Sequence, residues 1–145
     1  IIKYGPLTIL PFTGRHLRPV TLEGKLCLGY HITQEDGLTL AFPADVRDYT
    51  LEGLPELGNA DYCFAHVWLG DGNCLEADFS PLDSQWAKFM LHFSSKRILL
   101  THLDGMRREV FSWRPHHAMH LAKCILEQSP DTVTLIPRRG EVIRL

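Results

Sequence analysis

The stretch Ile98-Leu99-Leu100-Thr101-His102-Leu103-Asp104-Gly105 decides the fold of this chain. Its three consecutive apolar residues predict a strand that is buried on both faces, as strands of parallel sheets are. The strand must end where the polar residues begin, so His102 lies at its carboxyl end. Because open α/β sheets bind ligands at the carboxyl ends of their strands, His102 is a candidate site residue.

The segments before this stretch complete a strand-helix-strand unit. Residues 62–69 are almost continuously apolar and predict a central strand, with His66 inside it or at its end. Residues 81–93 predict a helix, because their apolar side chains recur on one helical face. The length of this crossover implies that strand 62–69 pairs in parallel with strand 97–101. His102 is therefore expected on the same sheet edge as the end of strand 62–69.

His16 follows the first strand-like segment of the chain. Residues 7–12 have strand character, and Gly14 then interrupts the pattern. This order places His16 at a strand end or in a loop.

Asp45 follows a predicted hairpin. Residues 26–32 alternate between two faces, and residues 38–42 return after the turn sequence at 35–37. The returning strand ends at Pro43. A second strand end therefore carries a carboxylate.

Three further elements complete the predicted fold. Leucines at helical spacing indicate a short helix at 51–57, and a second amphipathic helix runs from Pro115 to about residue 128. Residues 133–136 and 141–145 predict a terminal hairpin. The chain is thus expected to be an α/β protein with a mixed sheet and flanking helices.

Length and composition predict one globular domain over residues 1–145. With 45% hydrophobic residues the chain can bury a sizeable core, and its formal charge of −2 gives no electrostatic signature of nucleic acid or an anionic membrane. No apolar run approaches the length that spans a bilayer. The four cysteines lack metal-ligand spacing, so we expect free thiols in a soluble, cytoplasmic protein. The first residue is Ile1 rather than Met, so we expect a piece of a longer protein.

His16, Asp45 and His102 are the candidate metal ligands. Each follows a predicted strand, and imidazoles with a carboxylate on converging strand ends form the donor set that holds zinc, manganese or iron. Such a metal lowers the pKa of bound water enough to supply hydroxide near neutral pH. The alternative is that the three are unrelated surface or capping residues.

Other histidines have competing interpretations. His116 and His120 lie one helical turn apart and could share an ion, but no Glu lies between them as in helical zinc-protease motifs, which favours a solvated or partner-facing helix end. His66 is either a catalytic residue, acting as a proton shuttle or holding a ligand in place, or a satisfied core histidine.

The order of these segments resembles the C-terminal half of metallo-β-lactamase-fold hydrolases. The resemblance rests on the sequences Pro43-Ala44-Asp45-Val46 and Leu100-Thr101-His102, together with the apolar strand around His66. It implies one half of an αββα fold, with His16 as the mid-chain metal-binding histidine, Asp45 as the bridging aspartate and His102 as the final metal-binding histidine. The implied reaction is attack on an ester, amide, lactone or phosphodiester by metal-bound hydroxide, with zinc as the first expectation.

Two departures from that family's pattern are visible. The His-x-His-x-Asp-His signature, which provides most ligands of the first metal, does not occur in these 145 residues. Ala44 replaces the glycine that usually precedes the aspartate. The chain alone would then hold half of a dinuclear site and be inactive or bind metal weakly.

Two interpretations therefore stay open. In the first, the chain is the C-terminal portion of a metal-dependent hydrolase that acts on a small-molecule substrate, with its N-terminal half missing. In the second, it is a non-enzymatic α/β interaction module or homo-oligomer. An exposed half-sheet would favour association in both cases.

Overall fold

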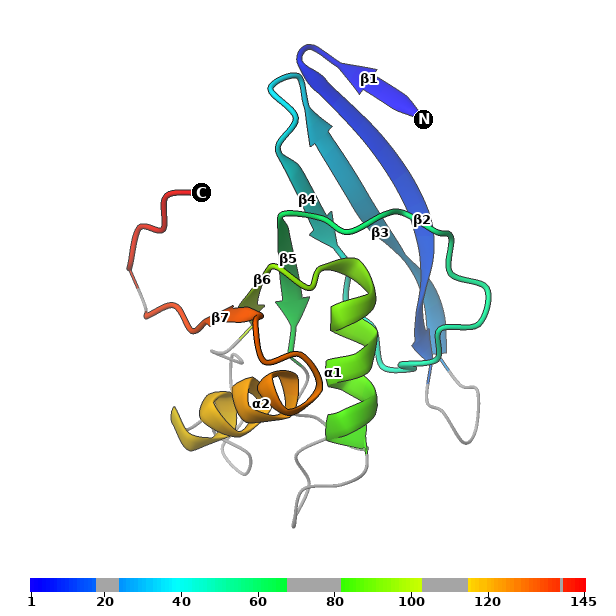
Figure 1. Ribbon diagram of the computed structural model, residues 1–145. Helices are drawn as coiled ribbons and strands as arrows, with labels where there is room; N and C mark the ends of the chain where they lie inside the picture. The colour runs from blue at the N-terminus through cyan, green and yellow to red at the C-terminus, as the bar shows by residue number, and fades with distance from the viewer. Residues whose placement is uncertain (18–23, 68–81, 103–114, 139) are drawn as a thin grey trace.

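A single mixed sheet organises the molecule (Figure 1). The computed structural model describes residues 1–17, 24–67, 82–102, 115–138 and 140–145. Its elements are β1 (Ile2–Tyr4), β2 (Leu7–Leu17), β3 (Gly24–Gln34), β4 (Thr39–Phe42), β5 (Tyr62–His66), α1 (Leu82–Phe93), β6 (Arg97–Thr101), α2 (Pro115–Gln128) and β7 (Val133–Leu135). The strands of this described part lie in sequence order across the sheet. The predicted α/β class and mixed sheet are confirmed.

Strand directions bring the carboxyl ends of β2, β4, β5 and β6 to one edge of the sheet. Strands β1 to β4 pair antiparallel, and β4 to β7 pair parallel. Because β2 and β4 are both antiparallel to β3, they run in the same direction. The carboxyl ends of β2, β4, β5 and β6 therefore lie at the same edge, which we call the carboxyl edge.

One face of the sheet packs against both helices. Alternate residues of β4, β5 and β6 point into this core, including Ala41, Ala65 and Leu100. They meet large apolar residues of α1, such as Trp86, and of α2, such as Leu121, all of them fully buried. The periodicity of 3.6 residues in the helices and of 2 in the strands accounts for this layer.

The opposite face is apolar and partly open. Leu26 and Leu28 of β3 point to this face and are 67% and 56% exposed. Further along the same face, the rings of Phe42 and Phe64 stack with centroids 4.3 Å apart. In the described part of the chain, no helix covers this face (Figure 1).

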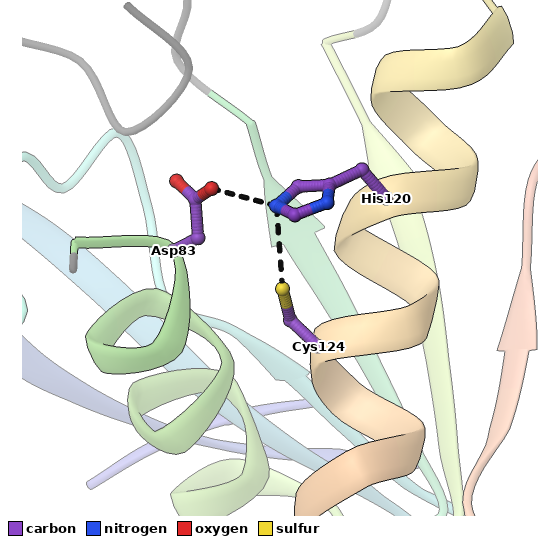
Figure 2. A group of neighbouring side chains, drawn as sticks. All are labelled: Asp83, His120 and Cys124. Carbon is purple, nitrogen blue, oxygen red and sulfur yellow. Dashed lines mark hydrogen bonds and ion pairs between the residues drawn. The ribbon is translucent and has the colours of Figure 1, made fainter. Parts of the chain in front are cut away.

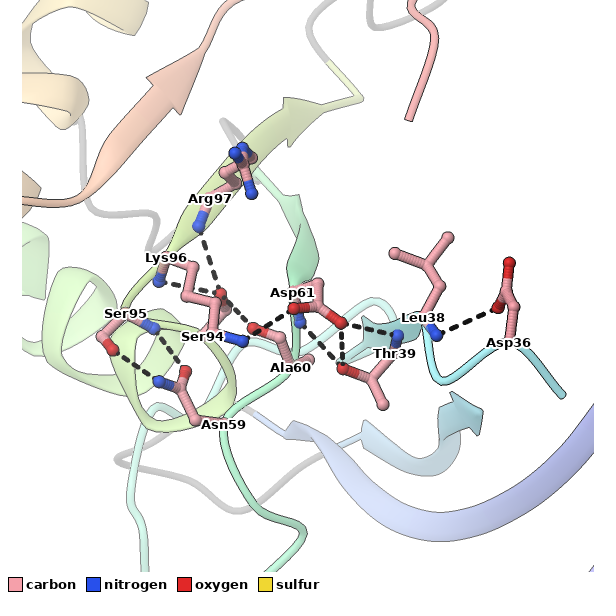
Figure 3. Close-up of polar contacts among 10 residues, drawn as sticks. All are labelled: Asp36, Leu38, Thr39, Asn59, Ala60, Asp61, Ser94, Ser95, Lys96 and Arg97. Atoms are coloured by element: carbon pink, nitrogen blue, oxygen red, sulfur yellow. Dashed lines mark hydrogen bonds and ion pairs between the residues drawn. The ribbon is translucent and has the colours of Figure 1, made fainter. Parts of the chain in front are cut away.

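A polar network fixes the amino ends of the parallel strands (Figure 3). The backbone N–H and hydroxyl of Thr39 both donate to Asp61 Oδ2, at 2.9 and 2.8 Å. Lys96 Nζ donates to Asp61 Oδ1 at 2.7 Å, and the Ser94 hydroxyl donates to the Ala60 carbonyl at 2.8 Å. These contacts link the starts of β4, β5 and β6 and so help to set their register.

Several details of the structure differ from the sequence-based expectations. Residues 51–57 form a turn and extended chain instead of a helix, because Gly53 and Gly58 adopt positive φ and Pro55 lies between them. The prediction of a terminal hairpin is wrong, because β7 pairs in parallel with β6 and residues 141–145 form no strand. Strand 62–69 ends earlier, at His66, and residues 68–69 lie outside the described part. The short strand β1 was not expected.

Three described cysteines and two described helices bear on the expectations of free thiols and of no membrane span. Cys27, Cys63 and Cys124 are free, and Cys74 lies outside the described part. Among the helices that the structure describes, none is both long enough and apolar enough to cross a bilayer.

Candidate metal centre

The carboxyl edge gathers His16, Asp45, His66 and His102. His16 is the penultimate residue of β2, Asp45 follows β4, His66 ends β5 and His102 follows β6. His16 belongs to the strand because β2 continues through Gly14 instead of stopping there. The structure therefore brings together the three predicted metal ligands and the predicted catalytic histidine.

Contacts with β2 hold the segment that carries Asp45. The Arg15 carbonyl accepts hydrogen bonds from the N–H groups of Arg47 and Asp48, at 3.1 and 3.2 Å. The Arg15 guanidinium also pairs with Asp48, at 3.1 Å. Gly14 permits this approach, because a Cβ there would lie 2.9 Å from the Cys27 sulfur and 3.3 Å from the Pro43 carbonyl oxygen.

The Asp45 carboxylate lies between two imidazoles. Its Oδ2 is 3.3 Å from His16 Nε2, and its Oδ1 is 3.0 Å from His66 Nε2. Each oxygen thus faces a different histidine. This is the arrangement expected of a carboxylate that can bridge two positions.

His102 joins the group through His66. The two rings stack with centroids 4.1 Å apart and planes 24° from parallel. His102 Nδ1 lies 3.2 Å from the Val67 carbonyl oxygen, which can only accept a hydrogen bond, so Nδ1 carries the proton. In the neutral ring Nε2 then presents a lone pair, the tautomer that metal-binding histidines adopt when a carbonyl holds the other nitrogen.

Backbone strain marks the same edge. In the described ranges, Ala44 and His102 are the two non-glycine residues with positive φ, at 73° and 60°. Such conformations are uncommon for residues with a Cβ and concentrate at functional sites. Both strained residues belong to the proposed ligand segments, and Ala44 adopts the conformation that a glycine at its position would favour.

The imidazoles control the ionisation of Asp45. Burial raises the pKa of this carboxyl, but the close approach and charge of His66, with the charges of His16 and His102, outweigh it. The net pKa lies below the ordinary value of an aspartate. Asp45 is therefore a carboxylate at neutral pH, as a metal ligand must be.

Two pairs of donor atoms at this edge have separations near those of metal ligands. Asp45 Oδ1 and His66 Nε2 are buried and have no hydrogen-bond partner of suitable geometry among the described residues, although they lie 3.0 Å apart. Ligands of a tetrahedral zinc, with bonds of about 2.0–2.1 Å, lie about 3.3 Å from each other. The observed separations of 3.0 and 3.3 Å are close to that spacing.

A pocket of about 250 Å³ opens beside these donors. It is lined by Asp45, His66 and Thr101, together with Ala44 and the stacked rings of Phe42 and Phe64. Ionisable groups and apolar rings thus line the same pocket. Small-molecule sites commonly combine these two kinds of lining.

His116 and His120 of α2 lie in different surroundings. His116 is exposed and contacts the ring of His117. His120 turns toward Asp83 of α1, so the two-histidine site considered from the sequence does not form. The sequence did not link Asp83 to His120, because the two residues lie 37 positions apart. Cys124 lies one helical turn after His120, and this spacing was the sequence signal that could have indicated the cluster.

Comparisons with known proteins reveal similarity of structure without similarity of sequence. No protein-family profile matches the chain, and no curated protein is significantly similar to it. The metallo-β-lactamase fold protein YhfI from Bacillus subtilis superposes with a TM-score of 0.60 at 19% identity, over 97% of this chain and 49% of that chain. Unliganded yeast PDE1 superposes with a TM-score of 0.54 at 14% identity, over 95% of this chain and 46% of that chain.

The chain therefore spans about half the length of these structures. Identity this low establishes the fold alone. The protein has the fold of one half of a metallo-β-lactamase-fold protein.

Proposed function

We propose that the chain is the metal-binding part of a hydrolase that cleaves an ester, lactone, amide or phosphodiester. The observation that supports the proposal is the convergence of His16, Asp45 and His102, with His66, at one sheet edge. The fold shared with part of YhfI adds support. Further ligands from outside these 145 residues would complete the reaction centre.

Each residue has a distinct role in this proposal. Asp45 offers one carboxylate oxygen toward His16 and the other toward His66. His16 and His102 provide neutral imidazole nitrogens. A divalent metal, with zinc as the first candidate and manganese or iron as others, would supply a water molecule of lowered pKa as the nucleophile.

His66 is proposed to act beside the metal. Its Nε2 faces Asp45 Oδ1, and its backbone carbonyl accepts a hydrogen bond from the Trp86 indole at 3.1 Å. The ring is therefore held in place on both sides, by Asp45 at its edge and by His102 at its face. A histidine so positioned can hold or transfer a proton near the reacting bond.

The pocket suggests which part of the substrate lies next to the metal. The Phe42 and Phe64 rings form an apolar wall beside Asp45. We propose that this wall contacts an apolar or aromatic group adjoining the cleaved bond.

Metal analysis of purified variants tests the proposal. The wild-type chain should bind zinc, manganese or iron, and Asp45→Ala or His102→Ala should weaken binding at the carboxyl edge by about tenfold or more. Glu52→Ala is the control, because Glu52 is an exposed carboxylate close to Asp45 in the sequence. Retention of wild-type affinity in both ligand variants would refute the assignment. Hydrolysis of p-nitrophenyl esters and bis(p-nitrophenyl) phosphate, assayed with the bound metal, then tests the reaction class.

The open apolar face favours the second candidate, an interaction module. Leu26 and Leu28 are exposed on a face without a described covering helix. A face of this kind promotes association. If association rather than catalysis is the role, light scattering should show a stable oligomer that Leu28→Glu dissociates, while Asp45→Ala leaves it intact.

A further inference from the structure

We propose that Asp83, His120 and Cys124 form a second, separate zinc site between α1 and α2. Figure 2 shows the three side chains converging from the first turn of α1 and from successive turns of α2. One donor atom from each residue lies within 4.8 Å of the other two. None of these residues belongs to the carboxyl edge.

The contacts converge on one imidazole nitrogen. Asp83 Oδ2 lies 2.7 Å from His120 Nε2, and the Cys124 sulfur lies 3.5 Å from the same nitrogen. In a catalytic Cys-His-Asp relay the acid and the nucleophile contact opposite nitrogens of the ring. Here both contact Nε2, so the three donors surround one point instead of forming a chain.

The distances leave room for zinc after a small adjustment. With a zinc–nitrogen bond of about 2.0 Å and a zinc–sulfur bond of about 2.3 Å, the tetrahedral nitrogen–sulfur separation is about 3.5 Å, as observed. The nitrogen–oxygen separation would have to grow from 2.7 Å by about half an ångström. A rotation of the Asp83 side chain can provide this movement.

The donor chemistry favours zinc over harder cations. A thiolate and an imidazole are ligands for zinc and copper, whereas magnesium and calcium prefer oxygen. Asp83 is 3% exposed and Cys124 8% exposed, and the His120 side chain is 22% exposed, so the cluster is largely buried. Three protein donors leave one tetrahedral position for a water molecule.

The surroundings of Cys124 are less consistent with a nucleophilic thiol than with a metal ligand. Burial, with the negative charge of Asp83, raises the pKa of Cys124. Reactive cysteines instead have a lowered pKa beside positive groups. A bound metal cation would instead lower the pKa of the Cys124 thiol, because it stabilises the thiolate directly.

The ion would join the two helices near the carboxyl edge without being part of it. Asp83 lies one helical turn before Trp86, whose indole holds the His66 carbonyl. Zinc at this position would fasten the start of α1 to α2. Its role would be to stabilise the helix pair that supports β5.

Cobalt spectroscopy of the metal-stripped protein tests this second site. Co²⁺ added to the wild-type chain should produce a near-ultraviolet thiolate-to-cobalt charge-transfer band, and Zn²⁺ should displace it. Cys124→Ser should abolish the band, and Asp83→Asn should weaken Co²⁺ binding by about tenfold or more. His116→Ala is the matched control, because His116 is an exposed imidazole on the same helix. It should keep the band.

Further variants separate the two sites. His102→Ala should keep the charge-transfer band. In an Asp45→Ala background, in which the carboxyl-edge site is disabled, Zn²⁺ should still raise the melting temperature, and adding Cys124→Ser should remove that increase. Absence of the band in folded wild-type protein would refute the site and leave an interhelical ion pair. Persistence of the band in Cys124→Ser would also refute it, because the sulfur ligand would then be another cysteine. Circular dichroism confirms that each variant is folded.

Discussion

At the scale of single residues, the carboxyl edge concentrates unfavourable local features. Ala44 and His102 adopt positive φ, and Asp45 Oδ1 and His66 Nε2 are buried without a well-aligned hydrogen bond among the described residues. Each feature costs free energy in the metal-free protein. The features have a common explanation if the edge is shaped to bind an ion.

Replacing Ala44 by glycine should stabilise the protein. A left-handed conformation costs an alanine about 1 kcal/mol or more, and the added flexibility of an unfolded glycine offsets only part of this. We expect Ala44→Gly to increase the free energy of unfolding by about 0.5 kcal/mol, measured by urea denaturation. Ala87→Gly, in the middle of α1, should have the opposite sign. A destabilised Ala44→Gly protein would show that the strain is absent.

Asp61 should make stability depend on pH in the acid range. Hydrogen bonds from Lys96 and Thr39 lower its pKa to about 2 in the folded protein, below that of the unfolded chain. Its ionised form is therefore stabilised by folding, and this contribution is complete above about pH 4 and lost as the pH falls toward 2. Asp61→Asn should lower the free energy of unfolding by about 1 kcal/mol at neutral pH. The value is modest because Asp61 is partly exposed. The difference from wild type should disappear near pH 2; a difference independent of pH would contradict this assignment.

At the scale of elements, the sequence predicted regular segments well and irregular ones poorly. The unit β5-α1-β6 was predictable because its apolar periodicity is strong and the crossover length dictates parallel pairing. Residues 51–57 were mistaken for a helix because three leucines at that spacing also pack on the core from an irregular segment. The partner of β7 was not predictable, since a short apolar strand can pair with a local or a distant neighbour.

The same reasoning explains what was predicted of the candidate site. The edge shared by His66 and His102 followed from the strand-helix-strand unit. The contact of His66 with Asp45 did not, because it depends on the turn at Ala44 and on the hydrogen bonds to Arg15. The Asp83–His120 contact depends on how two helices pack, which the periodicity of either helix does not determine.

Helix α1 should support the carboxyl edge through Trp86. Its indole is fully buried and donates to the His66 carbonyl. Trp86→Phe removes this hydrogen bond and some buried volume, so we expect a loss of about 2 kcal/mol in the free energy of unfolding and weaker metal binding at the carboxyl edge. Phe89→Leu, a buried change on the same helix, should lower stability while preserving metal affinity. Equal effects of the two variants on metal affinity would exclude a specific role for the Trp86 hydrogen bond.

At the scale of the whole molecule, the layers correspond to one half of a larger architecture. One sheet face packs against α1 and α2, and the other is apolar with exposed leucines. The superposition with YhfI includes 97% of this chain but 49% of the YhfI chain. The pocket beside Asp45 is lined by Phe42 and Phe64 of the open face, so a layer that covers this face would lie next to the candidate site.

The most direct test of the metal centre is anomalous X-ray diffraction from crystals of the chain soaked in zinc. The account predicts an anomalous peak at the carboxyl edge, about 2.0–2.2 Å from an Asp45 carboxylate oxygen and from the Nε2 atom of His16 or His102. This peak should be absent in Asp45→Ala crystals and present in those of Glu52→Ala, a variant at an exposed carboxylate. A saturating zinc soak that leaves the carboxyl edge without a peak would contradict the central claim.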